Sequence, residues 1–130
     1  MKSILQSLII FSIFVSAAVA DTKILCTETN GDFTKEGTVH KFNIVFNTDS
    51  GQAYIRYRSP NRIALELTVL PASLEFRESD IIETKITSVN RSSLEYSRVD
   101  TLWTGGKFPS NGTCVIKKIE PEDRLEPNKI

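Results

Sequence analysis

VHKFNIVFNTDSGQAYIRY, residues 39–57, alternates apolar and polar side chains with the two-residue period of a β-strand. The alternation holds on both sides of residues 47–51, a polar segment that ends at Gly51. Glycine tolerates the positive φ that a tight turn often needs. Strand, turn and strand in direct succession predict a β-hairpin with one apolar face.

The same period continues outward from this hairpin in both directions. Six more strands are predicted, at residues 23–29, 62–69, 73–77, 81–87, 92–98 and 113–119. No long window shows the apolar spacing of an amphipathic helix, and residues 99–112 are predicted to be irregular. We therefore expect an all-β protein, an antiparallel up-and-down meander of about eight strands closed into a barrel or folded as a two-layer sandwich.

The two ends of the chain differ in composition from this central part. Lys2, the apolar run at residues 8–15 and the motif Ala18-Val19-Ala20 predict a signal peptide over residues 1–20, cleaved before Asp21. We expect an exported domain over residues 21–119, periplasmic or secreted, that does not insert into the membrane once the leader is removed. Residues 120–130 hold two prolines and six charged side chains, which predict a flexible charged tail.

The chain has two cysteines, Cys26 and Cys114, one near each end of the predicted domain. In an exported protein an isolated pair most simply forms one disulfide. A metal site needs three or four convergent ligands, and the chain has a single histidine, so no metal and no other cofactor is expected. The disulfide would hold the first and last strands together, which favours the barrel.

The charges balance, with 16 Lys and Arg against 16 Asp and Glu. This balance argues against nucleic acid or an anionic membrane as the main partner, because both select a basic surface.

One candidate binding surface surrounds the turn at residues 59–61. Its members are Tyr54, Arg56, Arg58 and Arg62. Arginine forks suit carboxylates and phosphates, and a tyrosine beside them could stack on a ring. The alternative, which we favour, is an ordinary solvated strand face whose arginines pair with Glu66 or Glu75.

Trp103, just before Gly105-Gly106, is a second candidate binding residue, since a loop tryptophan is a typical hot spot of an interface. The alternative, which we favour, is that its indole plugs one end of the barrel.

His40 is expected at the barrel mouth, and no spacing links it to a catalytic partner. No catalytic residue is therefore predicted, and we do not expect an enzyme. The interior is predicted to hold Phe33, Phe42, Phe46, Phe76 and Tyr96.

Two short motifs carry resemblances to known families. The leader, Ile24-Leu25-Cys26-Thr27, the meander and Asn111-Gly112-Thr113-Cys114 resemble small exported two-cysteine β-barrel proteins of proteobacteria. That resemblance implies the fold and the periplasm but no activity. Leu102-Trp103-Thr104-Gly105-Gly106 resembles periplasmic lysozyme inhibitors, which are also small disulfide-linked barrels, although their tyrosine-rich loop is not recognisable here. Asn111-Gly112 is interpreted as a turn entering the last strand.

These observations together predict a binding or interaction module of the bacterial periplasm, whose partner is a protein or glycan of the cell envelope. The alternative is an inhibitor of a hydrolase such as lysozyme. Exposure of Trp103 would favour the inhibitor.

Overall fold

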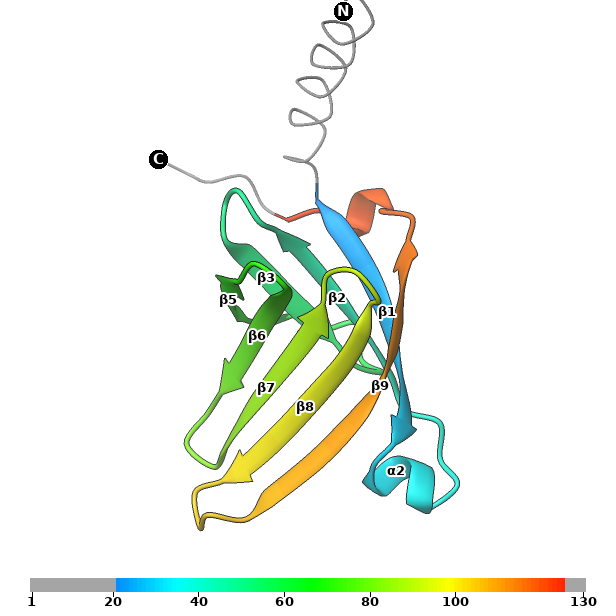
Figure 1. Cartoon of the computed structure of the whole chain (residues 1–130). Helices are drawn as coiled ribbons and strands as arrows, with labels where there is room; N and C mark the ends of the chain where they lie inside the picture. The colour runs from blue at the N-terminus through cyan, green and yellow to red at the C-terminus, as the bar shows by residue number, and fades with distance from the viewer. Residues whose placement is uncertain (1–20, 126–130) are drawn as a thin grey trace, which may run out of the picture.

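The structure, a computed structural model, describes residues 21–125 (Figure 1). The predicted signal peptide, residues 1–20, and the last part of the predicted tail, residues 126–130, lie outside the described residues. Within the described part of the chain, neither helical segment has the length and apolar character needed to cross a membrane.

Residues 21–125 form nine antiparallel strands. They are β1 (Thr22–Asn30), β2 (Lys41–Asn47), β3 (Gln52–Arg56), β4 (Ile63–Ala64), β5 (Glu66–Val69), β6 (Ser73–Ser79), β7 (Glu83–Asn90), β8 (Glu95–Leu102) and β9 (Lys107–Lys117). One turn of helix, α2 (Asp32–Lys35), follows β1, and a 3-10 turn, Pro121–Asp123, follows β9. The all-β prediction is confirmed.

The sheet curves into a nearly closed barrel in which strands adjacent in sequence are paired (Figure 1). β4 and β5 are the two halves of one bent segment: β4 pairs with β3, and β5 pairs with β6. At the bend, the backbone N–H of Leu65 donates to the carbonyl of Ala53, at 3.0 Å. The predicted strand at residues 62–69 thus completes the barrel, and the predicted meander is confirmed.

The disulfide joins the first and last strands, as predicted. Cys26 of β1 and Cys114 of β9 lie directly opposite each other and are bonded. Gly112, two residues earlier, lies inside β9 and not in the turn predicted there. A Cβ at this position would lie 2.0 Å from the carbonyl oxygen of Thr27 and 2.7 Å from the ring of Tyr96. The glycine is therefore needed for close approach of β1 and β9, not for a turn.

The buried core occupies the barrel interior and belongs mainly to inward positions of β1, β2, β3, β6, β7 and β8. It includes Ile24, Phe42, Ile44, Phe46, Ile55, Leu74, Phe76, Val89 and Tyr96. Four of the five predicted interior aromatics are therefore confirmed. The fifth, Phe33, lies on α2 and is 45% exposed, so its prediction was wrong.

The stretch predicted to be irregular, residues 99–112, is mostly a β-hairpin. β8 continues to Leu102 and β9 begins at Lys107, and their ends project past the packed core (Figure 1). Asp100 pairs with Phe108, and Val99 with Pro109. Val99 and Phe108 point to opposite faces of the hairpin and are both exposed, which explains why the alternation fails here. Trp103, in the turn of this hairpin, is 78% exposed and plugs nothing.

Residues 120–125, predicted to be flexible, pack on the outside of β1 and β3. Asp123 is 1% exposed and forms ion pairs with Lys23 and Arg56. The backbone N–H of Leu125 donates to the carboxylate of Asp21, at 2.8 Å. We call residues 120–125 the C-terminal clasp. Charged residues order this segment because their partners lie on the barrel.

Candidate functional site

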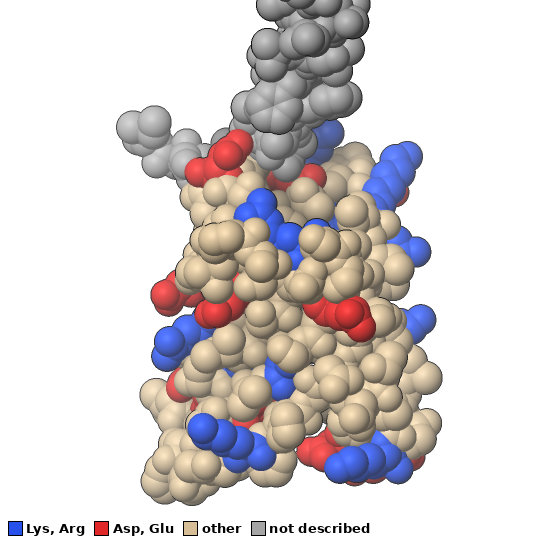
Figure 2. All heavy atoms as spheres, viewed as in Figure 1, with Lys and Arg blue, Asp and Glu red and all other residues tan. Residues whose placement is uncertain are grey.

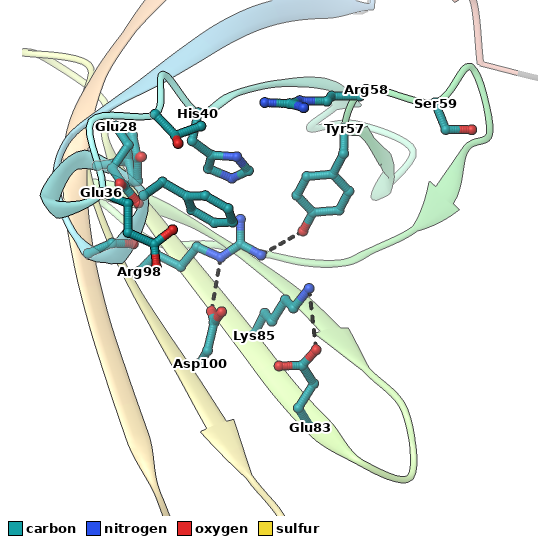
Figure 3. A pocket seen from close by; sticks show the side chains of 14 residues that line it. Glu28, Glu36, His40, Tyr57, Arg58, Ser59, Glu83, Lys85, Arg98 and Asp100 are labelled. Atoms are coloured by element: carbon teal, nitrogen blue, oxygen red, sulfur yellow. Dashed lines mark hydrogen bonds and ion pairs between the residues drawn. The ribbon is translucent and has the colours of Figure 1, made fainter.

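A cavity of about 660 Å³ lies at one end of the barrel, and we call it the mouth cavity. Its wall comes from the end of β1, the segment before β2, the segment after β3, the start of β7 and the projecting β8–β9 hairpin (Figure 3). α2 contributes Phe33 to one side. The core fills the barrel beyond this end, so packed side chains close the inner end of the cavity. We call this inner end the floor.

The floor carries two buried polar side chains from neighbouring inward positions of β8, Tyr96 and Arg98 (Figure 3 labels the arginine). Arg98 is 5% exposed; its Nε donates to the carboxylate of Asp100 at 3.0 Å, and its Nη2 donates to the hydroxyl of Tyr57 at 2.6 Å. Among the residues the structure describes, neither Arg98 Nη1 nor Tyr96 Oη has a hydrogen-bond partner. Buried polar atoms are nearly always paired, so these two call for an explanation.

Both groups keep their ordinary protonation at neutral pH. Burial alone would lower the pKa of Arg98, but Tyr57 and Asp100 raise it above its ordinary value. Burial, with the charge of Glu28 added, raises the pKa of Tyr96 to about 12. The floor therefore presents one cationic donor and one neutral hydroxyl.

Aromatic rings form one wall above this floor. Phe33 and His40 stack with their centroids 4.3 Å apart, and the ring of Tyr57 lies 6.1 Å from that of His40 at an interplanar angle of 20°. Burial, followed by the charge of Arg98, lowers the pKa of His40, so its imidazole is neutral at pH 7. In Figure 3, His40, Tyr57 and Arg98 converge on the same space.

The carboxylate of Glu28 fixes α2 beside the cavity. It accepts hydrogen bonds from the backbone N–H and the hydroxyl of Thr34, at 2.9 and 2.8 Å. Gly31 permits this arrangement, because a Cβ there would lie 2.6 Å from the Glu28 carboxylate. The sequence Gly31-Asp32-Phe33-Thr34 thus places the ring of Phe33 over His40.

Charges of both signs line the cavity. The cations are Arg58, Lys85 and Arg98, and the carboxylates are Glu28, Glu36, Glu83 and Asp100. Lys85 and Arg98 each have a carboxylate partner, Glu83 at 3.5 Å and Asp100 at 3.0 Å respectively. The cavity therefore has no excess positive charge with which to attract an anion.

The predicted arginine surface is divided in the structure. Arg56 pairs with Asp123, and Arg62 donates to the carbonyl oxygens of Glu122 and Arg124. Tyr54 is buried, and the guanidinium of Arg62 lies 4.4 Å from its ring centroid. These three residues hold the C-terminal clasp, and their partners are not Glu66 or Glu75. Only Arg58 of the predicted set lines the mouth cavity.

Sequence reasoning placed His40 at the mouth but did not identify Tyr57, Arg98 or Glu28 as site residues. A signal was present for one of them. Arg98 follows Tyr96 by two residues, so it occupies the inward face of a strand, where a charged side chain is unusual.

A second surface lies at the tips of two neighbouring hairpins. Ile81 is 94% exposed, Ile82 and Trp103 are also exposed, and the backbone N–H of Trp103 donates to the carbonyl of Ile82 at 2.8 Å. We call Ile81, Ile82 and Trp103 the apolar tip.

The face of the molecule viewed in Figure 2 carries Lys and Arg interspersed with Asp and Glu.

Within residues 21–125, no three His, Cys, Asp or Glu side chains converge to hold a metal ion. Comparisons of this chain with protein-family models, with curated proteins and with solved structures found no match. The resemblances to two-cysteine barrels and to lysozyme inhibitors therefore stay predictions.

Proposed function

We propose that this protein is an exported binding module that takes up a small ligand in the mouth cavity. The observation that carries this proposal is that Arg98 and Tyr96 line the floor of a cavity of about 660 Å³ and that their buried atoms Nη1 and Oη have no partner within residues 21–125. Binding sites typically combine a preformed concave surface with a few convergent polar groups. Both atoms have almost no accessible surface in the free protein, so neighbouring side chains must shift slightly for a ligand to reach them. A ligand that then supplied partners would remove their desolvation penalty, about 1–3 kcal/mol for each.

The packed core supports this location of the site. Phe42 and Phe76 are almost completely buried and fill the interior below the floor, so the barrel is not a hollow lipid carrier. A rigid scaffold under the floor also holds Tyr96 and Arg98 in place before a ligand arrives, which lowers the entropic cost of binding.

The same proposal includes export of the protein from the cytoplasm. Its support is the predicted leader at residues 1–20 together with the disulfide, since structural disulfides persist in oxidising compartments. We place the protein in the bacterial periplasm or outside the cell.

The test uses His40, which is the only histidine of the chain and lies in the cavity wall. The NMR signals of its ring are followed while sugars, dicarboxylic acids and short fatty acids are added one class at a time. We expect at least one class to shift these signals saturably in the wild type and not in Arg98→Met. Arg77→Met, on the outer face of β6, is the control and should behave as the wild type. If no class shifts the His40 signals, the proposal is wrong.

The apolar tip supports a second candidate function, inhibition of a hydrolase through an inserted loop. Trp103 is 78% exposed in a tight turn that projects beyond the barrel, and exposed tryptophans dominate many interfaces. The test measures the activity of a lysozyme with increasing amounts of the protein. Inhibition that falls at least about tenfold in Trp103→Ala would support this function. Absence of inhibition by the wild type would exclude it for the lysozyme tested.

A further inference from the structure

We propose that the ligand of the mouth cavity is an uncharged sugar residue. This inference rests on the proposed function, namely that the cavity binds a small molecule, and it specifies the chemistry of that molecule. Three observations lead to it: the unpaired atoms of the floor, the balance of charges and the wall of rings.

The floor requires oxygen atoms from the ligand. Arg98 Nη1 only donates, so its partner must be an acceptor, whereas Tyr96 Oη both donates and accepts. A hydroxyl or an amide oxygen of a sugar accepts from the guanidinium, and a neighbouring hydroxyl pairs with the tyrosine. An alkyl chain would leave both atoms unpaired and add to their cost.

The charges around the cavity favour a neutral ligand. Three cations face four carboxylates, and both Lys85 and Arg98 are already paired with carboxylates. An anion would approach Glu28 and Asp100 with no unpaired excess of cations to offset its desolvation, and a cation would meet Arg98 on the floor. A neutral polar molecule avoids both penalties.

The wall supplies the apolar half of a sugar site. The rings of Phe33 and His40 are nearly parallel, at 15°, and Tyr57 is inclined by 20° to His40. A pyranose has a face of C–H groups that packs on such rings and an edge of hydroxyls that forms hydrogen bonds. The lining of the mouth cavity contains both kinds of group: the rings of Phe33, His40 and Tyr57, and the guanidinium of Arg98 (Figure 3 labels His40, Tyr57 and Arg98).

The experiment compares sugars that differ mainly in charge. Glucose and N-acetylglucosamine are the neutral probes, glucuronate and glucosamine are their charged counterparts, and decanoate is the apolar acid. Affinities come from the His40 ring signals at about 50 and about 500 mM NaCl. We expect saturable shifts with a neutral sugar, at least about tenfold weaker binding of the charged counterparts, and less than about a twofold change with salt.

Two tyrosine variants locate the site. Tyr96→Phe removes the unpaired hydroxyl and should weaken sugar binding about tenfold, since the site loses one hydrogen bond to the ligand. Tyr54→Phe is the matched control: its hydroxyl donates to the carbonyl of Asp123, away from the cavity, so affinity should not change.

The outcomes separate this inference from the proposed function. If glucuronate or decanoate shifts the His40 signals and the neutral sugars do not, the sugar inference is overturned while the proposed function stands. If none of the probes shifts them, and the broader classes used above also fail, both are overturned. Sugar binding that is unchanged in Tyr96→Phe would overturn the inference that the floor recognises the sugar.

Discussion

Tyr96 and Arg98 are polar side chains at buried positions, where they cost stability. Both side chains lie on the inward face of β8, where an apolar residue would pack without a desolvation penalty. Arg98 is held by Tyr57 and Asp100, so its geometry is fixed although its Nη1 has no partner within residues 21–125. We interpret this as preorganisation of the site, and the stability of single variants tests the interpretation.

Tyr96→Phe should therefore stabilise the protein. The substitution keeps the ring and removes a buried hydroxyl that has no partner within the described chain, so the free energy of unfolding should rise by about 1 kcal/mol. Tyr54→Phe, by contrast, should lower it by about 1 kcal/mol, because its hydroxyl bonds to Asp123. Urea unfolding measures both. A loss of stability in Tyr96→Phe would show that the hydroxyl is satisfied in the free protein.

Gly112→Ala tests the close approach of β1 and β9. The added methyl group would lie 2.0 Å from a backbone oxygen of β1, which cannot move without separating the strands. We expect a loss of about 3 kcal/mol in the free energy of unfolding, as for severe overpacking. Gly106→Ala, whose added methyl group would meet no atom closer than 3.6 Å, is the control. Equal stability of the two variants would contradict this account of Gly112.

Among the elements, the C-terminal clasp explains an otherwise puzzling feature of β2. Val45 is fully buried although the neighbouring inward residues Ile44 and Phe46 place it on the outer face of the barrel. It pairs across the sheet with Lys23 and Tyr54, and both of these residues contact the clasp. Residues 120–125 therefore act as a cover over the outside of β1, β2 and β3.

Asp123→Asn should weaken this cover in a pH-dependent way. Burial alone would raise the pKa of Asp123, but hydrogen bonds from Lys23, the Glu120 N–H and Arg56 lower it below its ordinary value of 3.8. A carboxyl with a lowered folded pKa contributes stability above its unfolded pKa and loses it as the pH falls through the folded value. We expect the variant to lose about 2 kcal/mol at about pH 7, because breaking a largely buried ion pair leaves cations unpaired.

The difference between the variant and the wild type should shrink as the pH falls below 3.8 and the wild-type carboxyl becomes protonated at its lowered pKa. Thermal unfolding across this range measures it, and Asp49→Asn, in the exposed turn after β2, is the control. A constant difference at every pH would contradict the proposed role of the Asp123 charge.

The elements that the sequence predicted well are those with one buried face. In β2 the alternation of Phe42, Ile44 and Phe46 predicts the strand because its inward side chains meet the core. The pattern failed at the β8–β9 hairpin, where both faces are exposed beyond the core, and at the clasp. Asp123 is buried by ion pairs with residues 67 and 100 positions away, which composition does not reveal.

For the whole molecule, closure of the barrel was predictable from two cysteines, whereas the mouth cavity was not. The pairing of Cys26 with Cys114 requires that the first and last strands meet, whatever the order of the others. The cavity instead depends on how far β8 and β9 extend past the core and on where α2 places Phe33. Its chemistry comes from residues on segments that are far apart in the sequence, and no local motif signals their convergence.

The disulfide should contribute a large part of the stability of the molecule. It closes a loop of 88 positions between the strands that complete the barrel, so it restricts the unfolded chain strongly. Replacing both cysteines, Cys26→Ala with Cys114→Ala, should lower the free energy of unfolding by about 4 kcal/mol. The loss exceeds that expected from the two small side chains alone, because most of it arises in the unfolded state.

Urea unfolding of the double variant and of the wild type with and without reductant measures the effect. Reduced wild type should match the double variant closely, and intact mass after alkylation should show no free thiol in the oxidised protein. Equal stability of the oxidised and reduced forms would mean that β1 and β9 are held by their backbone pairing and packing alone.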